Sequence, residues 1–393
     1  MSLFSKIGTI LITCGRGAAP CLGREVARLG FPVLAENPFG IEIKGTFEDT
    51  MSLNLNLRTA QRVLYRIARF TASDPREFYR NLNDLPWENY IDTGEYLSVS
   101  SVVETPSIRD SRFANLTAKD AIVDRLAAQC GQRPDSGPQR SGVVVHCYWK
   151  GRQCDVYFDT SGEPLFRRGY RLASVEAPLQ ESLAAALIMA SGWTGTEHFV
   201  NPMCGSGTFA VEAALMALDK APGLLRNNFG FMHVKGYKGS AWRQLRNARN
   251  REAGTSAAIR IVATDIDETA VQAARTNARA AGVESCIEFK VAPFQKTEIP
   301  EGNGMVVINP EYGKRLGDQR KLETVYRLMG DFLKHHCTGY RAAVFTGNLE
   351  LAKHIGLRTS RKLVFFNGNI ECRLLCYDLY AGSRKASQGW HYQ

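Results

Sequence analysis

Apolar residues in the second half of the chain gather in short runs that end where glycine, proline or an acid follows. Phe199 and Val200 form one such run, which precedes a glycine turn and then, from Thr208, apolar residues at helical spacing. This order predicts a strand, a tight turn and a helix. Gly205 and Gly207 allow the turn to approach a ligand closely, and free amides at the helix start favour an electron-rich group. An ordinary α/β turn gives the same local pattern, and the P-loop and GxGxxG motifs are incomplete here.

Two further apolar runs predict parallel strands of the same sheet. Residues 305–308 are apolar and end at Asn309 and Pro310, and residues 259–264 are largely apolar and end at Asp265, before a predicted helix over 268–281. Ligands of open α/β sheets bind at the carboxyl ends of such strands. An acid at this place accepts both hydroxyls of a ribose, although a helix cap or a solvated loop acid also explains Asp265.

The remaining pattern predicts more strands and helices. The predicted strands cover residues 7–14, 40–45, 96–103, 142–149, 153–159, 340–346, 362–366 and 370–379, and the predicted helices cover 20–29, 57–70, 117–129, 178–191 and 348–355. The helix predicted over 57–70 carries four arginines that face RNA phosphate or solvent: Arg58, Arg62, Arg66 and Arg69. Residues 226–251 hold four aromatic residues that are expected to form a wall for an unstacked nucleotide or a packed cover over the cofactor cleft: Phe229, Phe231, Tyr237 and Trp242.

Composition indicates a globular chain of two or three domains. Of the 393 residues, 44% are hydrophobic, which is enough for substantial cores. The formal net charge of +10 suits an anionic partner such as nucleic acid, although mild basicity is common among soluble proteins. No run approaches the roughly 18 apolar residues of a membrane helix, and the run at 7–12 is too short for a secretory signal. We therefore expect a cytoplasmic protein with no membrane partner.

The ten cysteines are scattered and form no CxxC pair, and the seven histidines form no ligand-spaced cluster. This distribution predicts reduced thiols and no metal site. Cys204 lies inside the glycine turn, and it is interpreted as a small wall residue because no histidine lies near it in sequence to act as a base.

The glycine turn, the strand that ends at Asp265 and the sequence Asn309-Pro310-x-Tyr312 follow one another at strand ends. In this order they resemble a class I S-adenosylmethionine-dependent methyltransferase that acts on an exocyclic amino group. Residues 159–165, 167–171 and 177–179 resemble the join between a THUMP domain and its catalytic domain. Almost the whole chain is similar to the THUMP-containing RNA guanine-N2 methyltransferases, and most similar to the RlmL type that modifies large-subunit ribosomal RNA.

The resemblance implies a Rossmann-like class I methyltransferase domain with a seven-stranded mixed sheet over residues 166–393, in an α/β chain. It implies a ferredoxin-like lobe over 1–60 and an α+β THUMP domain that docks RNA over 61–165. It also implies S-adenosyl-L-methionine as the cofactor, bound by Asn201, Pro202, Cys204, Gly205, Ser206, Gly207, Thr208, Asp265, Ile266 and Asn309.

RNA, and 23S ribosomal RNA in particular, is the partner that the resemblance implies. The cations that we expect to contact it are Arg109, Arg112, Lys119, Arg167, Arg168, Lys314 and Arg315. Solvated surface charge is the alternative for these residues, and a structural clasp between domains is a further alternative for Arg167 and Arg168.

The residues that the resemblance makes catalytic are Asn309, Pro310 and Tyr312. A guanine N2 amine is a poor nucleophile because its lone pair is drawn into the ring, so it must be held in line with the methyl group. The side-chain oxygen of Asn309 and the carbonyl of Pro310 can each accept one amine hydrogen, and Tyr312 can stack on the flipped base. No strong base is required, since the amine loses its proton after it carries the methyl.

Three positions depart from the family pattern and bear on cofactor affinity and base choice. Position 201 usually holds an acid that steadies the methionine end of the cofactor, and Asn201 carries no charge. Position 311 is usually proline, and Glu311 adds a charge there. The strand over 287–291 usually leads to an acid near the adenine amine, whereas Pro293 and its neighbours follow here.

These observations lead to the hypothesis of an enzyme that makes N2-methylguanosine in 23S ribosomal RNA. A guanine in transfer RNA and adenine N6 in DNA are alternative targets, because Asn-Pro-x-Tyr serves any exocyclic amine. An RNA-binding ribosome-assembly factor with a degenerate catalytic domain is an alternative of another class. The sequence identifies neither the target nucleotide, nor the oligomeric state, nor the need for a second catalytic subunit.

Overall fold

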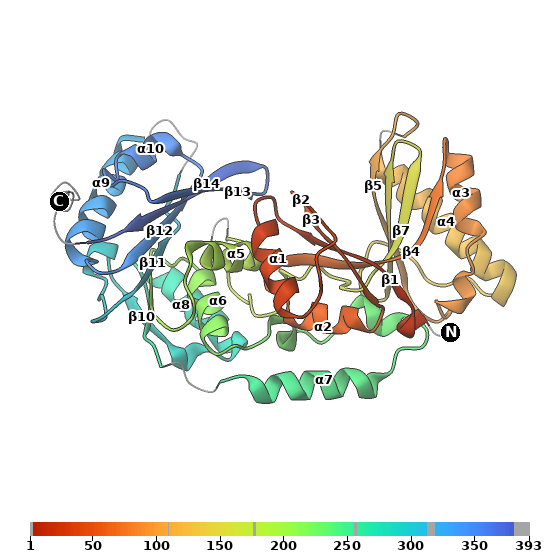
Figure 1. Cartoon of the computed structure of the whole chain (residues 1–393), viewed down its shortest axis with the longest axis horizontal. Coiled ribbons are helices and arrows are strands. Elements are labelled where there is room, and N and C mark those ends of the chain that lie inside the picture. The colour runs from red at the N-terminus through yellow and green to blue at the C-terminus, as the bar shows by residue number, and fades with distance from the viewer. Residues whose placement is uncertain (1–2, 109, 176–177, 255–257, 313–318, 381–393) are drawn as a thin grey trace, which may run out of the picture. The chain divides into compact units, whose positions relative to one another are not determined.

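The computed structural model describes residues 3–108, 110–175, 178–254, 258–312 and 319–380 (Figure 1). The chain divides into two compact units. Residues 1–15, 19–168 and 221–252 form the first unit, and residues 16–18, 169–220 and 253–393 form the second. No helix of the described residues is long and apolar enough to cross a membrane.

The first unit is built, in its described part, on seven strands in the order β2-β3-β1-β4-β7-β6-β5. β5 and β6 are parallel, and the other neighbours are antiparallel. The strands are β1 (Ile7–Cys14), β2 (Ala35–Asn37), β3 (Gly40–Thr46), β4 (Ala60–Thr71), β5 (Leu97–Glu104), β6 (Val143–Lys150) and β7 (Gln153–Asp159). The helices are α1 (Ala19–Arg28), α2 (Asp49–Asn56), α3 (Pro75–Asn83), α4 (Ser111–Cys130) and α7 (Gly239–Glu252), with short 3-10 helices η1 (Leu3–Ser5), η2 (Trp87–Asn89), η3 (Pro222–Leu225) and η4 (Gly230–His233).

The helix predicted over residues 57–70 is wrong, because this stretch is β4, which pairs with β1 and β7. Val63 and Tyr65 are buried, whereas Arg62 and Arg66 are partly exposed, which is the two-residue alternation of a strand. A bulge between Arg66 and Ala68 returns the next arginine to the face of Arg66. Because of the bulge, Arg66 and Arg69 share a face of the sheet although they are three residues apart, which is a spacing typical of a helix.

Other predicted elements are confirmed with shifted ends. Helix α4 begins six residues earlier than predicted, because the Asp110 carboxylate caps it by accepting from the Arg112 amide. Thr117, predicted as its first residue, instead donates its hydroxyl to the Phe113 carbonyl inside the helix. Among the elements of this first unit, helices α2, α3 and α7 and strand β2 were not predicted.

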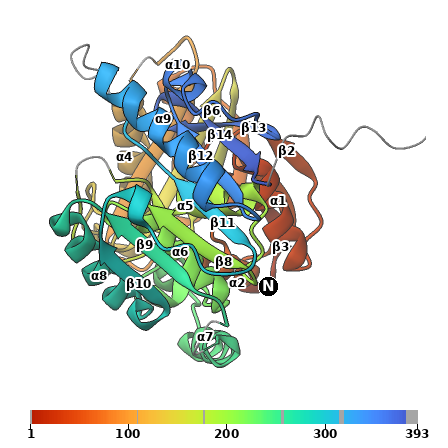
Figure 2. The ribbon, with the colours of Figure 1, turned by 90° about the vertical axis from the view of Figure 1, so that its left-hand side faces the viewer.

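The second unit holds, in its described part, another seven-stranded sheet, in the order β10-β9-β8-β11-β12-β14-β13 (Figure 2). The first five strands in this order are parallel, and β14 and β13 are antiparallel to their neighbours, so the predicted mixed sheet is confirmed. The strands are β8 (His198–Pro202), β9 (Ile261–Asp265), β10 (Ile287–Val291), β11 (Gly304–Ile308), β12 (Arg341–Thr346), β13 (Arg361–Asn367) and β14 (Ile370–Asp378).

Helices cover both faces of this second sheet. They are α5 (Glu181–Ser191), α6 (Thr208–Ala217), α8 (Glu268–Ala281), α9 (Gln319–His336) and α10 (Leu349–Lys353), with short 3-10 helices η5 (Glu284–Cys286) and η6 (Phe294–Lys296). Met329 and Phe332 of α9 share an apolar core with Val200, Val306 and Val344 of the sheet. Helix α6 contacts β8 and β9 and packs against α5 and α8, on the other side of the sheet from α9 (Figure 2).

Residues 221–252, which the prediction placed in the methyltransferase domain, pack with the first unit. A Cβ at Gly223 would lie 2.6 Å from the Leu55 Cα, so η3 touches α2 closely. Phe229, Phe231 and Trp242 are buried, with the two phenyl rings stacked at 5.2 Å between centroids. These three rings form a packed core, so the interpretation of them as a nucleotide wall is wrong. The predicted domain boundaries at 60/61 and 165/166 stay a proposal.

Substitution of Gly330 tests the packing of α9. A Cβ at this position would lie 1.9 Å from the Ile355 carbonyl oxygen, at the end of α10. We expect Gly330→Ala to lower the unfolding free energy by about 1–3 kcal/mol, since the clash exceeds the gain in helix propensity. Thermal and urea unfolding would measure the change. Gly254→Ala is the control, because its nearest neighbour lies at 3.6 Å; equal stability of the two variants would contradict the close approach.

Candidate active site

The carboxyl ends of three neighbouring strands form the centre of the candidate site. β8 pairs in parallel with β9 on one side and β11 on the other, so the chain leaves all three strands at one edge of the sheet. The direction of strand order reverses at β8, which is where open α/β sheets bind ligands. Asn201, Asp265 and Asn309 therefore come together from positions far apart in sequence, as predicted.

The glycine turn after β8 is fixed by its neighbours. Gly205 and Gly207 have φ values of 53° and 81°, in the left-handed region that favours glycine. The Gly205 amide donates to Oδ2 of Asp265 at 2.9 Å, and the Cys204 amide donates to the Thr264 carbonyl at 2.9 Å. A Cβ at Gly207 would lie 2.7 Å from the Cβ of Ala274 on α8. Larger residues at Gly207 would therefore displace the turn from α8.

Met203 is also in the left-handed region, with φ of 59°, which costs free energy for a residue with a side chain. This strain lies directly between β8 and the glycine turn. It persists because the hydrogen bonds on both sides hold the backbone. Strain of this kind is a feature of sites that are organised before a ligand binds.

Asp265 is partly exposed at the end of β9, and both of its oxygens are held. Oδ2 accepts from the Gly205 amide and Oδ1 accepts from the Asp267 amide at 3.1 Å. Ile266 follows with its side chain 73% exposed, and Val291, which pairs with Asp265 from β10, is 48% exposed. A carboxylate beside exposed apolar side chains suits a ribose that carries a flat, apolar-faced ring.

Two buried amide oxygens at the strand ends lack hydrogen-bond partners among the described residues: Oδ1 of Asn201 and Oδ1 of Asn309. The Asn201 amide nitrogen donates to the Val307 carbonyl at 2.9 Å, which fixes the side chain and leaves its oxygen free to accept. A buried acceptor without a partner costs about 1–3 kcal/mol. A bound ligand with N–H donors would supply the missing hydrogen bond to each of these oxygens.

Tyr312 is held behind the end of β11. Its hydroxyl accepts from the Asn367 amide nitrogen at 2.9 Å, and its ring lies 3.1 Å from where a Cβ on Gly347 would be. Burial raises the pKa of the Tyr312 phenol, so the ring is neutral at physiological pH. Pro310 is buried beside it, whereas Glu311 is exposed. The backbone carbonyl of Glu311 accepts from the Tyr326 hydroxyl at 3.3 Å.

The remaining predicted cofactor residues lie on or beside the turn. Pro202 ends β8, Ser206 and Thr208 are buried, and Cys204 is 8% exposed. Burial raises the pKa of the Cys204 thiol, since the ionised form would be poorly solvated. A protonated thiol is a weak nucleophile, in agreement with the prediction that Cys204 is a wall residue. The described residues contain no group of three metal-ligating side chains.

Models of two known protein families match stretches of this chain. A family model described as an RMKL-like methyltransferase domain matches residues 168–375. The chain belongs to this RMKL-like methyltransferase family. A second model, described as the RlmL ferredoxin-like domain, matches residues 9–64, in agreement with the predicted N-terminal lobe. The resemblance predicted from the sequence is therefore confirmed.

Relatives of this RMKL-like chain include the ribosomal RNA large subunit methyltransferase K/L of Syntrophotalea carbinolica (strain DSM 2380 / NBRC 103641 / GraBd1). It is 39% identical over 377 residues, which cover 93% of this chain and 53% of the relative. The chain spans about half the length of the curated relatives it matches.

Solved structures are also similar to this RMKL-like chain. The putative methyltransferase SMU.472, complexed with S-adenosylhomocysteine (SAH), is 29% identical, with a TM-score of 0.86 over 96% of this chain and 100% of that chain. A predicted N6-adenine-specific DNA methylase from Listeria monocytogenes str. 4b F2365 is 27% identical, with a TM-score of 0.85 over 95% of this chain and 97% of that chain.

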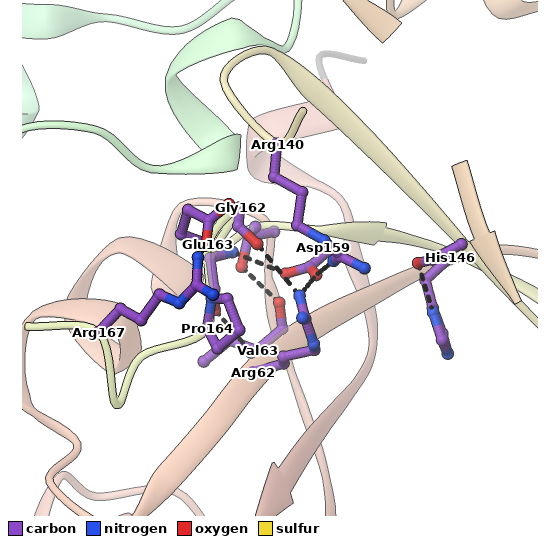
Figure 3. Close-up of polar contacts among 12 residues, drawn as sticks. Arg62, Val63, Arg140, His146, Asp159, Gly162, Glu163, Pro164 and Arg167 are labelled. Atoms are coloured by element: carbon purple, nitrogen blue, oxygen red, sulfur yellow. Dashed lines mark hydrogen bonds and ion pairs between the residues drawn. The ribbon is translucent and has the colours of Figure 1, made fainter. Parts of the chain in front are cut away.

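The cations predicted to contact RNA differ in their surroundings. Arg112 pairs with Asp110, Lys119 with Asp120, and Arg167 with Glu163 (Figure 3), so each lies beside one carboxylate at the surface. Arg168 is 1% exposed and donates to the Arg58 carbonyl at 2.7 Å. A buried guanidinium is not available to phosphate, so the expectation for Arg168 is corrected. Arg109, Lys314 and Arg315 lie outside the described residues.

Two residues that position the glycine turn of this RMKL-like domain were missed as site residues. Asn277 of α8 accepts from the Leu172 and Ala173 amides at 2.9 and 3.0 Å, and donates to the Ala173 and Ser206 carbonyls. Arg171 donates to Ser206 and Thr208 at 3.3 and 3.2 Å and forms an ion pair with Glu181. The signal for Asn277 is an amide on the buried, alanine-rich stripe of α8.

Replacement of Asn277 tests its role as a clamp. Asn277→Ala leaves four backbone polar groups of residues 172–173 and 206 without this partner, so we expect a loss of at least about 2 kcal/mol of stability. Amide hydrogen exchange at Leu172 and Ala173 should become faster than in the wild type. Thr276→Ala, one residue away on the same helix, is the control and should leave this exchange unchanged. Unchanged exchange in Asn277→Ala would show that the clamp does not hold the segment.

Proposed function

We propose that the chain is an S-adenosylmethionine-dependent RNA methyltransferase that transfers a methyl group to the exocyclic N2 of a guanine in 23S ribosomal RNA. The observation that carries the proposal is the buried, unpartnered Oδ1 of Asn309 at the end of β11, beside the fixed turn after β8. Ribosomal RNA is supported by the name of the methyltransferase K/L relative.

The strand ends fit the cofactor. Asp265, whose carboxylate is held by the Gly205 amide, would hold the ribose hydroxyls. The exposed side chain of Ile266 would contact the adenine, and the unpartnered Oδ1 of Asn201 would accept from the amino group of the methionine end. The turn of Gly205 and Gly207 would let the cofactor approach the backbone closely, and the other contacts would come from Pro202, Cys204, Ser206, Thr208 and Asn309. S-adenosylmethionine, when bound, supplies an electrophilic methyl group.

The residues after β11 prepare the target amine. Oδ1 of Asn309 accepts one amine hydrogen and the Pro310 carbonyl accepts the other, which directs the nitrogen lone pair away from the protein oxygens. Tyr312, fixed through Asn367 and Gly347, offers its ring to the base. The base must leave its stack to reach this position, which costs a few kcal/mol in a paired region and less in a loop.

Adenine N6 is a second candidate target. Two acceptors at Asn309 and Pro310 bind any exocyclic amine, and one similar structure is described as a predicted N6-adenine-specific DNA methylase. The ribosomal RNA methyltransferase relatives, at higher identity, favour RNA.

Transfer of labelled methyl from S-adenosylmethionine tests the proposal. The substrates are unmodified ribosomal RNA, transfer RNA and DNA, each digested to nucleosides afterwards. We expect label in N2-methylguanosine from ribosomal RNA, and a loss of roughly 100-fold or more in rate for Asn309→Ala, since one fixed hydrogen bond to the reacting group is removed. Asn303→Ala, an exposed asparagine just before β11, is the matched control and should retain the wild-type rate.

Other outcomes would overturn parts of the proposal. Label in N6-methyladenine would replace guanine with adenine as the target, and label only from transfer RNA would replace the RNA. Cofactor binding without transfer to any substrate would favour a binding factor over an enzyme.

A further inference from the structure

The sheet of the first unit has an apolar and a polar face. Ile10, Ile12, Ile41, Ile43 and Val63 are 0% exposed on the apolar face. Helices α1 and α3 lie on that face, because Gly23 of α1 lies close to the Ile41 side chain and Phe78 of α3 stacks on Trp149 at 4.6 Å. The alternating residues of the same strands form the opposite, polar face.

Two buried aspartates of β7 organise this polar face, and each holds two arginines. Asp155, 4% exposed, accepts from Nε and Nη2 of Arg69 at 2.5 and 3.0 Å, and lies 3.6 Å from Nη1 of Arg66. Asp159, 1% exposed, accepts from Arg62 and from Nη1 of Arg140 at 3.3 Å (Figure 3). Each group has two cations for one carboxylate, so each keeps a surplus positive charge.

The face as a whole is positive. The described strand residues of this face, together with Arg140, carry six cations and four carboxylates, which leaves a net charge of +2: Lys44, Arg62, Arg66, Arg69, Arg140 and Lys150 against Glu42, Glu104, Asp155 and Asp159. His146 lies on this face (Figure 3) and adds no charge at physiological pH, because burial lowers its pKa to about 4.

The arginines of this face are both fixed and reachable. The Arg69 side chain is 47% exposed, and those of Arg66 and Arg62 are about one fifth exposed. Arg66 also donates to the Thr9 hydroxyl at 2.7 Å, to which Lys44 donates at 3.0 Å. Guanidinium groups that are already held lose little conformational entropy when they bind a further anion.

We propose that this paired-arginine face, defined by Lys44, Arg62, Arg66, Arg69 and Arg140, binds the phosphate backbone of RNA. The inference rests on the proposed function for the choice of RNA. Phosphate oxygens match the paired N–H donors of a guanidinium group. The surplus positive charge around Asp155 and around Asp159 is available to attract phosphate. By contrast, each of Arg112, Lys119 and Arg167 is matched by one neighbouring carboxylate and leaves no such surplus.

Paired charge removal in the full chain tests the proposal. The variant Lys44→Ala with Arg69→Ala removes two exposed cations and leaves Arg66 beside Asp155, so no buried carboxylate loses all its partners. Arg28→Ala with Arg76→Ala, on α1 and α3, removes the same charge on the apolar side. The affinity of each protein for a labelled, mixed-sequence RNA hairpin is measured by fluorescence anisotropy over a series of salt concentrations.

We expect the Lys44/Arg69 variant to bind the hairpin roughly tenfold more weakly at low salt, and its salt slope to fall by about 1–2, the value for two lost phosphate contacts. The control variant should bind within about twofold of the wild type. An equal loss of hairpin affinity in both variants would show that only the overall charge matters. Unchanged affinity of the Lys44/Arg69 variant would show that RNA binds elsewhere. Either result would overturn the proposal.

Methyl transfer and S-adenosylmethionine binding separate this proposal from the proposed function. If the wild-type protein transfers methyl and the Lys44/Arg69 variant binds the hairpin as tightly as the wild type, the proposed function stands. Only the proposal that this face binds RNA is then rejected. Selective loss of hairpin binding in a protein that transfers no methyl would keep the face and reject the enzyme. Unchanged cofactor binding and thermal unfolding in the variant exclude misfolding as the cause.

Discussion

The pairing of β8 with β9 on one side and β11 on the other is the constraint on which the candidate site depends. Parallel strands leave a sheet at one edge, so this pairing alone brings residues 201, 265 and 309 together. These strands are apolar and buried on both faces, so the helices packed on both sides of the sheet hold them in place. Asn201 adds a link across the same strands through the Val307 carbonyl. The site is thus set by the core before any ligand is present.

The turn after β8 and the neighbouring strand ends keep a fixed geometry at a cost in folding free energy. Met203 has a left-handed backbone, and two buried amide oxygens lack partners. The hydrogen bonds of Gly205 to Asp265, and of Asn277 to residues 172–173 and 206, offset these costs from outside the turn. The same hydrogen bonds that keep the backbone strained also keep it in one position. A ligand that satisfies the two oxygens therefore meets a surface that is already formed.

The local sequence pattern predicts the strands and turns of the site. It does not predict the distant residues that hold the glycine turn in place. The apolar runs at β8, β9 and β11 have clear ends, so Asn201, Asp265 and Asn309 could be placed from the sequence. Asn277 acts on residues about 104 positions earlier, and no local pattern contains such a contact. Arg168 is buried although its charge predicts exposure. β4 was mistaken for a helix because its bulge gives Arg66 and Arg69 a helical spacing.

The departures from the family pattern acquire physical meanings in this structure. An acid at position 201 could not donate to the Val307 carbonyl, whereas Asn201 donates there and still presents an oxygen acceptor. The neutral amide of Asn201 thus lacks the charge of an acid but adds a hydrogen bond between β8 and β11. Pro293 follows Ala292, whose amide donates to the Asp265 carbonyl at 2.9 Å, so the pairing of β9 and β10 extends to the edge where the acid is usually found. Glu311 keeps its side chain in solvent while its carbonyl accepts from Tyr326. All three residues leave the amide oxygens of Asn201 and Asn309 in place, without hydrogen-bond partners among the described residues.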